Sequence, residues 1–113
     1  MINNRLVNYI QQRDKLSPWV LQQRWYDWCR QIDDELNEAA EAITIGDTEH
    51  IASELGDVLI LVFSMIARYS SFQRVFDAAY RKLRARAPYV LAKKPVTLEQ
   101  ELKYWIDGKA KGK

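Results

Sequence analysis

The sequence predicts an all-α protein, an antiparallel bundle of four to five helices in a single domain spanning residues 1–113. Three observations predict this fold class. Glycine and proline are scarce, at four and three residues. Apolar residues recur at intervals of three and four positions, and the strict alternation that marks half-buried strands is missing. The breaks in this pattern fall at residues that typically end or begin helices.

The first main helix is predicted to start at Ser17-Pro18, because serine is a preferred N-cap and proline is tolerated at the first helical position. It should end near Gly46, a typical C-terminal cap. A short helix over 3–13 precedes it, within an N-terminal extension of residues 1–16. The buried stripe of the main helix is predicted to comprise Trp25, Trp28, Ile32, Leu36, Ala39 and Ile43.

The second main helix is predicted to begin at Asp47 or Thr48 and to end at Ser70-Ser71. A third helix should cover 72–87 and stop before Pro88, and 89–96 is predicted to be a loop. A capping box over 97–100 opens the last helix, which ends near residue 110 before a basic tail. The apolar stripe of the second helix comprises Ile51, Leu55, Val58, Leu59, Val62, Ile66 and Tyr69.

Residues 58–67 are apolar on nearly every side, and a helix of that kind is normally buried all round. One small bundle offers few neighbours for it, so we expect a homodimer or tetramer formed through this helix. The alternative is that helices of the same chain cover it. A run of ten apolar residues is too short to span a bilayer, and the N-terminus lacks signal-peptide features. We therefore expect a soluble, cytoplasmic protein without membrane partners.

The net charge of +2 gives no electrostatic reason to expect nucleic-acid binding, although basic residues cluster over 81–86. One cysteine, Cys29, excludes an internal disulfide, and its place beside the apolar stripe indicates a small buried residue. With one histidine, His50, the chain cannot form the usual zinc site. Any metal must bind oxygen ligands, as Mg²⁺ and Mn²⁺ do.

Two pairs of carboxylates lie symmetrically about the predicted turn at Gly46. The pairs are Glu35 with Glu38, and Glu54 with Asp57; each shares one helical face. Glu38 and Glu54 are eight residues from the turn. Glu35 and Asp57 are eleven residues from it, so an antiparallel hairpin brings both pairs to matching heights. Four like charges at a helix seam repel one another unless divalent cations compensate them. The alternative is a solvated acidic surface.

Several segments together resemble the MazG-type nucleoside triphosphate pyrophosphohydrolases. Residues 34–43, DELNEAAEAI, are similar to the family's EExxExxxAI, and residues 54–59, ELGDVL, match its ELGDLL. Residues 17–23 are similar to CPWDxxQT, and residues 82–90 to KxxRRHPHV. A late WxxxK completes the set at 105–109. Departures from the family pattern, which leave the nucleobase preference open, are Val20, Arg24, Asp34, Ala87 and Tyr89.

The resemblance implies a dimeric helical hydrolase that uses Mg²⁺, or Mn²⁺, to cleave an NTP or dNTP between the α- and β-phosphates. The products are a nucleoside monophosphate and pyrophosphate, in nucleotide-pool house-cleaning. The implied metal ligands are Glu35, Glu38, Glu54 and Asp57. The implied catalytic residues are Asp34, Glu35 and Glu38, with Asp34 or a ligand carboxylate orienting or deprotonating the attacking water. The implied substrate-binding residues are Lys82, Arg86, Trp105, Lys109, Trp19 and Gln23.

Other interpretations stay open for several of these residues. Lys82 and Arg86 also fit a solvated basic face, Trp105 a core aromatic, and Trp19 a packing anchor. Two further functions remain: a narrower pyrophosphatase for dUTP, dCTP or phosphoribosyl-ATP, and a non-catalytic helical module that binds nucleotide or a protein partner. In such a module, Glu38→Gln would raise thermal stability with or without Mg²⁺.

Overall fold

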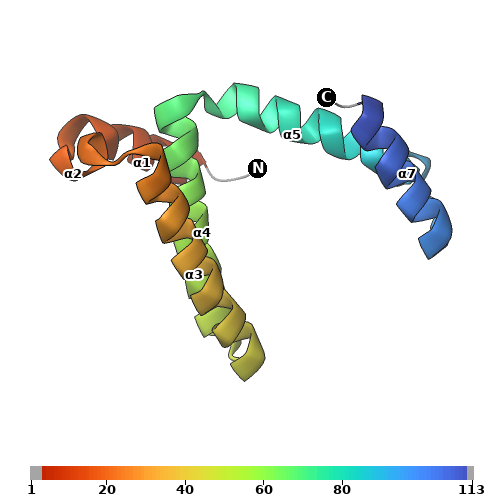
Figure 1. The fold of residues 1–113 in the computed structure, drawn as a ribbon, viewed down its shortest axis with the longest axis horizontal. Helices are drawn as coiled ribbons and strands as arrows, with labels where there is room; N and C mark the ends of the chain where they lie inside the picture. The colour runs from red at the N-terminus through yellow and green to blue at the C-terminus, as the bar shows by residue number, and fades with distance from the viewer. Residues whose placement is uncertain (1–3, 112–113) are drawn as a thin grey trace. The chain divides into compact units, whose positions relative to one another are not determined.

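The computed structural model describes residues 4–111 and contains seven α-helices, without strands, in that range (Figure 1). The all-α fold class is therefore confirmed. The chain divides into two compact units, residues 1–72 and 73–113, which we describe separately. The helices are α1 (Asn4–Leu16), α2 (Pro18–Gln22), α3 (Trp25–Ile45), α4 (Thr48–Tyr69), α5 (Phe72–Arg86), α6 (Tyr89–Ala92) and α7 (Leu98–Lys111).

The first unit is built around the antiparallel hairpin of α3 and α4, which lie side by side in Figure 1. Gly46 ends α3 in the left-handed conformation, with φ 85° and its N–H donated to the Ala42 carbonyl at 3.0 Å. Asp47 caps α4, because its carboxylate accepts from the backbone N–H of Glu49 at 3.0 Å and of His50 at 3.3 Å. The predicted turn and both of its caps are confirmed.

The prediction of one continuous helix from Pro18 to Gly46 is wrong. The N-cap is as expected, since Ser17 Oγ accepts from Val20 N at 3.2 Å. However, α2 ends at Gln22, because Gln23 is extended, with φ −70° and ψ 137°. The backbone N–H of Arg24 is then captured by the Asp27 carboxylate at 2.9 Å, which starts α3 as a separate helix.

Helix α1 is an integral part of the first unit, although residues 1–16 were expected to be an extension. Ile10 is buried, and Arg13 Nη2 donates to Ser64 Oγ on α4 at 2.7 Å. Ser64 is fully buried and donates its own hydroxyl to the Ile60 carbonyl at 2.6 Å. This chain of two hydrogen bonds ties α1 to α4.

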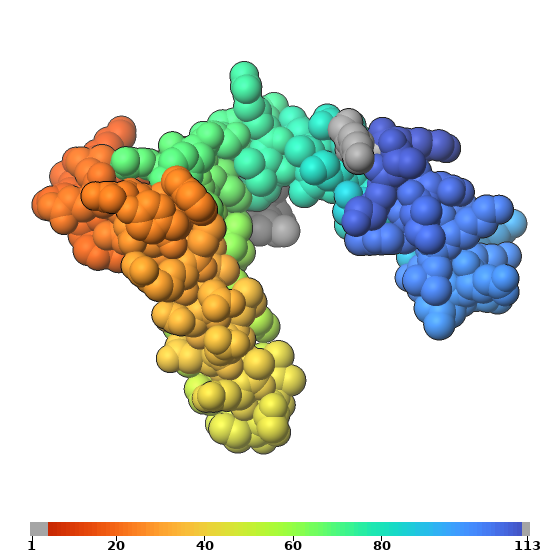
Figure 2. Space-filling model, in the orientation of Figure 1, coloured from red at the N-terminus to blue at the C-terminus, as the bar shows by residue number. Residues whose placement is uncertain are grey.

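The predicted apolar stripes are only partly buried within one chain. On α3, Trp28 and Ala39 are buried, as is Ala42, whereas Trp25 and Ile43 are exposed. Cys29 is also exposed, so its predicted burial is wrong. From the side seen in Figure 2, α3 covers much of α4, but the apolar surface of α4 extends beyond that contact. Exposed stripe residues comprise Trp25, Leu36, Ile43, Leu55, Leu59, Val62 and Tyr69.

By length and composition alone, α4 would also be able to cross a membrane, since its 22 residues include a window of mean hydropathy 1.6. The core helices of soluble proteins pass the same test. The ten-residue apolar run noted in the sequence therefore understates the apolar length of this helix.

In the second unit, α5 and α7 pack closely where Gly108 meets the backbone of Ala85 and Arg86. The capping box of α7 is confirmed: Gln100 N donates to Thr97 Oγ1 at 3.2 Å, and Thr97 N donates to Gln100 Oε1 at 3.0 Å. The predicted loop over 89–96 is partly wrong, because α6 forms within it and ends where Lys93 adopts a left-handed φ of 55°.

Candidate functional site

Three of the predicted carboxylates converge in the first unit. Glu35 and Glu38 from α3 and Glu54 from α4 each place one oxygen within 4.8 Å of the other two. The cause is local: the Gly46 turn makes the helices antiparallel, and the three-residue spacing aims Glu35 and Glu38 at the same side. The hairpin thus brings carboxylates from both sides of the turn together.

The carboxylates of this cluster repel one another. The pKa of Glu35 is raised to about 6, first by a hydrogen bond with the Glu38 carboxyl, then by partial desolvation and by the negative charges of Glu38, Asp57 and Glu54. Two carboxyl groups can share a hydrogen bond only when one of them carries a proton. Below about pH 6, a proton on Glu35 therefore offsets part of the repulsion that a bound cation would relieve, and the charge of Asp57 adds to that repulsion.

Two oxygens of the cluster have neither solvent nor a donor within the part of the chain that the structure describes. They are Glu35 Oε2 and Glu54 Oε2. The other Glu54 oxygen lies 3.3 Å from His50 Nε2. Shielded carboxylate oxygens without donors are costly for a folded protein unless something else binds them. This all-oxygen donor set fits a hard divalent cation.

An open groove of about 270 Å³ lies beside the cluster. Asp34, Glu35 and Asp57 line it, so the predicted general base and two predicted ligands border one space. Asp34 is exposed there. The sequence pattern did not indicate the remaining lining residues, Gln31, Ile60 and Leu61. For Gln31 a signal existed, because it lies four residues before Glu35 and thus on the same helical face.

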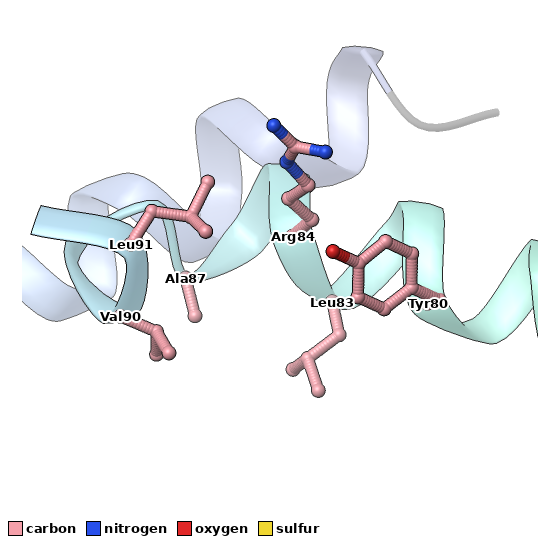
Figure 3. Close-up of a pocket in the computed structure, with 6 residues that line it drawn as sticks. All are labelled: Tyr80, Leu83, Arg84, Ala87, Val90 and Leu91. Carbon is pink, nitrogen blue, oxygen red and sulfur yellow. The ribbon is translucent and has the colours of Figure 1, made fainter.

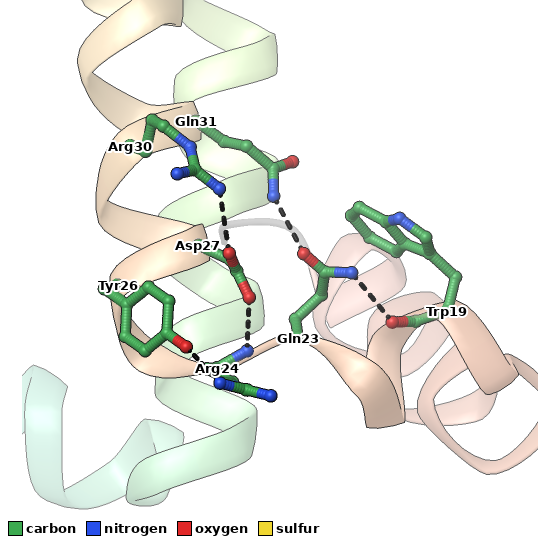
Figure 4. Close-up of polar contacts among 7 residues, drawn as sticks. All are labelled: Trp19, Gln23, Arg24, Tyr26, Asp27, Arg30 and Gln31. Carbon is green, nitrogen blue, oxygen red and sulfur yellow. Dashed lines mark hydrogen bonds and ion pairs between the residues drawn. The ribbon is translucent and has the colours of Figure 1, made fainter.

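Gln23 lies at the α2–α3 break and is hydrogen-bonded to Trp19 and to Gln31, as Figure 4 shows, and Gln31 lines this groove. Its Nε2 donates to the Trp19 carbonyl at 3.1 Å, and its Oε1 accepts from Gln31 Nε2 at 3.0 Å. Trp19 packs edge-on against the buried Trp28, with ring centroids 5.5 Å apart, yet remains 47% exposed. Trp19 therefore acts as a packing residue and still presents a free ring surface.

The second unit holds the other predicted substrate-binding residues. The Arg86 guanidinium lies over the Trp105 ring, 4.8 Å from its centroid, and Trp105 is 43% exposed rather than a core aromatic. Lys82 and Lys109 are exposed. Helices α5 and α6 also form a small apolar hollow of about 100 Å³ that the sequence did not predict (Figure 3). It is lined by Tyr80, Leu83, Arg84, Ala87, Val90 and Leu91.

The fold and the carboxylate cluster define an all-α protein with a site suited to divalent cations on a helical hairpin. The family model of the MazG nucleotide pyrophosphohydrolase domain matches residues 28–91, more than half of the chain. This protein belongs to that family.

Two curated relatives agree with this assignment. One is a nucleoside triphosphate pyrophosphohydrolase of Mycolicibacterium smegmatis, and the other is the protein of the same description from Mycobacterium tuberculosis. Each is 34% identical over 119 aligned positions, which cover 96% of this chain and 37% of the relative. The chain thus spans little more than a third of the length of these relatives. No solved structure matches the chain.

Proposed function

We propose that this protein is a Mg²⁺-dependent nucleoside triphosphate pyrophosphohydrolase. It would convert an NTP or dNTP and water to the nucleoside monophosphate and pyrophosphate, as part of nucleotide-pool house-cleaning. The observation that carries the proposal is the convergence of Glu35, Glu38 and Glu54 within 4.8 Å in a chain of the MazG family. The names of the two relatives point to the same reaction.

In this proposal, Glu35, Glu38, Glu54 and Asp57 hold the cations. When bound, Mg²⁺ neutralises phosphate charge and lowers the pKa of a coordinated water. Asp34 stands exposed at the groove wall, where it orients the attacking water or accepts its proton. A ligand carboxylate of the cluster is the alternative base.

The basic residues of the second unit would bind the phosphates. The Arg86 guanidinium lies over the Trp105 ring, 4.8 Å from its centroid, and this cation–π contact would restrain it while it binds phosphate oxygens. Lys82 and Lys109 are exposed and supply further positive charge. In the first unit, Trp19 and Gln23 would line the nucleoside side of the site.

We also propose that a second copy of the chain covers the apolar surface of α4. Leu55, Leu59 and Val62 are 47%, 43% and 37% exposed, which is unusual for three positions of one apolar stripe. Burying this surface in a two-fold homodimer would explain it in a soluble, cytoplasmic protein. In analytical ultracentrifugation the wild type should then sediment as a dimer and Leu59→Glu as a monomer. If the wild type and Leu59→Glu both had the mass of a dimer, the interface would lie elsewhere.

Product analysis tests the reaction. The purified protein with Mg²⁺ would be offered each common NTP and dNTP, with dUTP included, and all phosphate products would be resolved. We expect the monophosphate and pyrophosphate, because the attack is assigned to the α-phosphorus. Glu38→Gln should abolish turnover and the stabilisation by Mg²⁺. Glu41→Gln is the matched control, since Glu41 is an exposed carboxylate one turn further along α3.

Three results would contradict the proposal. Diphosphate with orthophosphate would mean that the terminal phosphate is attacked. Full activity of Glu38→Gln would mean that the cluster is not the site. Absence of turnover with every nucleotide, together with higher stability of Glu38→Gln in the presence and absence of Mg²⁺, would instead favour a non-catalytic binding module.

A further inference from the structure

The side-chain amide of Gln31 is oriented by a relay of hydrogen bonds that begins at the backbone. The Trp19 carbonyl can only accept, so Gln23 must present its Nε2 to it, at 3.1 Å. Gln23 Oε1 then faces Gln31 and accepts from Gln31 Nε2 at 3.0 Å. The backbone carbonyl of Trp19 therefore fixes which side-chain atom is nitrogen and which is oxygen in both Gln23 and Gln31.

This relay leaves Gln31 Oε1 as an acceptor. Figure 4 shows the oxygen pointing away from Gln23, and Gln31 lines the groove that Glu35 and Asp57 also border. Gln31 is half-buried and its Nε2 is bonded to Gln23, so its amide is restrained in the wall of the groove. An acceptor held in this way selects for a donor on the molecule that binds there.

The position of Gln31 indicates which part of a nucleotide it meets. It lies four residues before Glu35, about 6 Å along the helix axis, or one turn from the carboxylate cluster. In a nucleoside triphosphate bound by its phosphates at that cluster, the next group is the sugar, which carries hydroxyl donors. Gln23 and Trp19 lie further from the cluster along the same relay, on the side where the base would follow.

We propose that Gln31 is a specificity-determining residue whose Oε1 accepts a hydrogen bond from a hydroxyl of the substrate sugar. Gln23 is then a positioning residue that fixes the Gln31 amide. This inference rests on the proposed function, because it takes the phosphates to bind through cations held by Glu35, Glu38 and Glu54.

The test compares substrates that share a base and differ in sugar hydroxyls: the NTP, the dNTP and the 2′,3′-dideoxy NTP. The values of kcat/KM would be measured for the wild type, Gln31→Met and Gln23→Met. The NTP and dNTP pair reports on the 2′-hydroxyl, and the dNTP and dideoxy pair reports on the 3′-hydroxyl. Gln12→Met is the matched control, since Gln12 is exposed on α1.

We expect the wild type to prefer the hydroxylated member of one pair by about tenfold, which corresponds to the net contribution of one hydrogen bond. Gln31→Met should remove that preference by slowing the hydroxylated substrate, and leave the substrate without the hydroxyl unchanged. Gln23→Met should reduce the preference, and Gln12→Met should preserve it. Circular dichroism would confirm that each variant is folded.

An equal loss for all three sugars in Gln31→Met would overturn the inference. The inference would also be overturned if Gln31→Met shifted the dependence of the rate on Mg²⁺ concentration without changing the sugar preference, since Gln31 would then act as a metal ligand.

A second experiment measures the Kd of the non-hydrolysable α,β-methylene analogues of the three substrates by calorimetry, with Mg²⁺ present. If the wild type binds these analogues but turns over no nucleotide, the proposed reaction fails, while the binding preference still decides the role of Gln31. Absence of binding by all analogues would overturn both.

Discussion

Gly108 provides the sharpest test of the packing in the second unit. A Cβ placed on it would lie 2.5 Å from the Ala85 carbonyl oxygen and 2.6 Å from Arg86 Cα, well inside the 3.4 Å at which ordinary contact begins. Both neighbours are backbone atoms of α5, so no flexible side chain can move aside. The Gly108→Ala variant therefore forces α5 and α7 apart by several tenths of an ångström.

The expected cost of that overpacking is about 1–3 kcal/mol, and the gain in helix propensity from glycine to alanine returns up to about 1 kcal/mol. We expect a net loss of about 1–2 kcal/mol in the free energy of unfolding. Gly56→Ala is the matched control, because Gly56 is also helical and nothing lies within 4 Å of a Cβ there. It should stabilise the protein by about 0.5–1 kcal/mol.

Urea unfolding followed by circular dichroism would measure both variants, and hydrogen exchange would locate the change. We expect faster exchange in α5 and α7 of Gly108→Ala only. Arg86 and Trp105 lie on the same two helices near Gly108, with the Arg86 guanidinium carbon 4.8 Å from the centroid of the Trp105 ring. Because Gly108→Ala would disturb this contact, we expect weaker nucleotide binding as well. Equal stability of Gly108→Ala and Gly56→Ala would refute the close approach of α5 and α7.

Two further predictions concern the first unit. Because the pKa of Glu35 is raised from 4.5 to about 6, protonation of its carboxyl favours the folded state, and this stabilisation is complete below pH 4.5 and lost as the pH rises through about 6. In EDTA, the melting temperature of the wild type relative to Glu35→Gln should fall across this range, and Mg²⁺ should restore it; a constant difference would contradict the clustering of the carboxylates. Ser64→Ala should cost about 1 kcal/mol or more in urea unfolding, since Arg13 Nη2 loses its acceptor at 2.7 Å. Ser53→Ala, an exposed change on the same helix, should cost nothing, and equal stability of the two variants would mean that Arg13 finds water instead.

Much of the fold follows from local sequence signals. Ser17, Gly46, Asp47 and Thr97 all cap helices where the sequence predicted, because the cap is decided by hydrogen bonds within three or four residues. The break at Gln23 was not predicted, although the capture of Arg24 N by Asp27 is a local signal of the same kind. The apolar periodicity runs on through Arg24, and only the packing shows that Val20 and Trp28 are buried from two separate helices.

The burial of the apolar stripes was overestimated for the same kind of reason. Periodicity shows which face of a helix is apolar, but not which neighbour covers it. Thus Trp28 is buried, while Trp25 and Ile43 from the same predicted stripe are 63% and 57% exposed. The same holds for Cys29: its position beside the apolar stripe predicted burial, but no neighbouring helix within residues 4–111 covers it and it is exposed.

The sequence by itself determined the helical fold class, the family, and the convergence of carboxylates from both sides of Gly46, because a tight turn between two amphipathic helices fixes their register. Only the tertiary structure decided which groups surround those carboxylates. The shielded oxygens of Glu35 and Glu54, the raised pKa of Glu35 and the relay from Trp19 through Gln23 to Gln31 all depend on distances between side chains. Such distances depend on how helices pack against one another, and helical periodicity along one chain segment does not specify that packing.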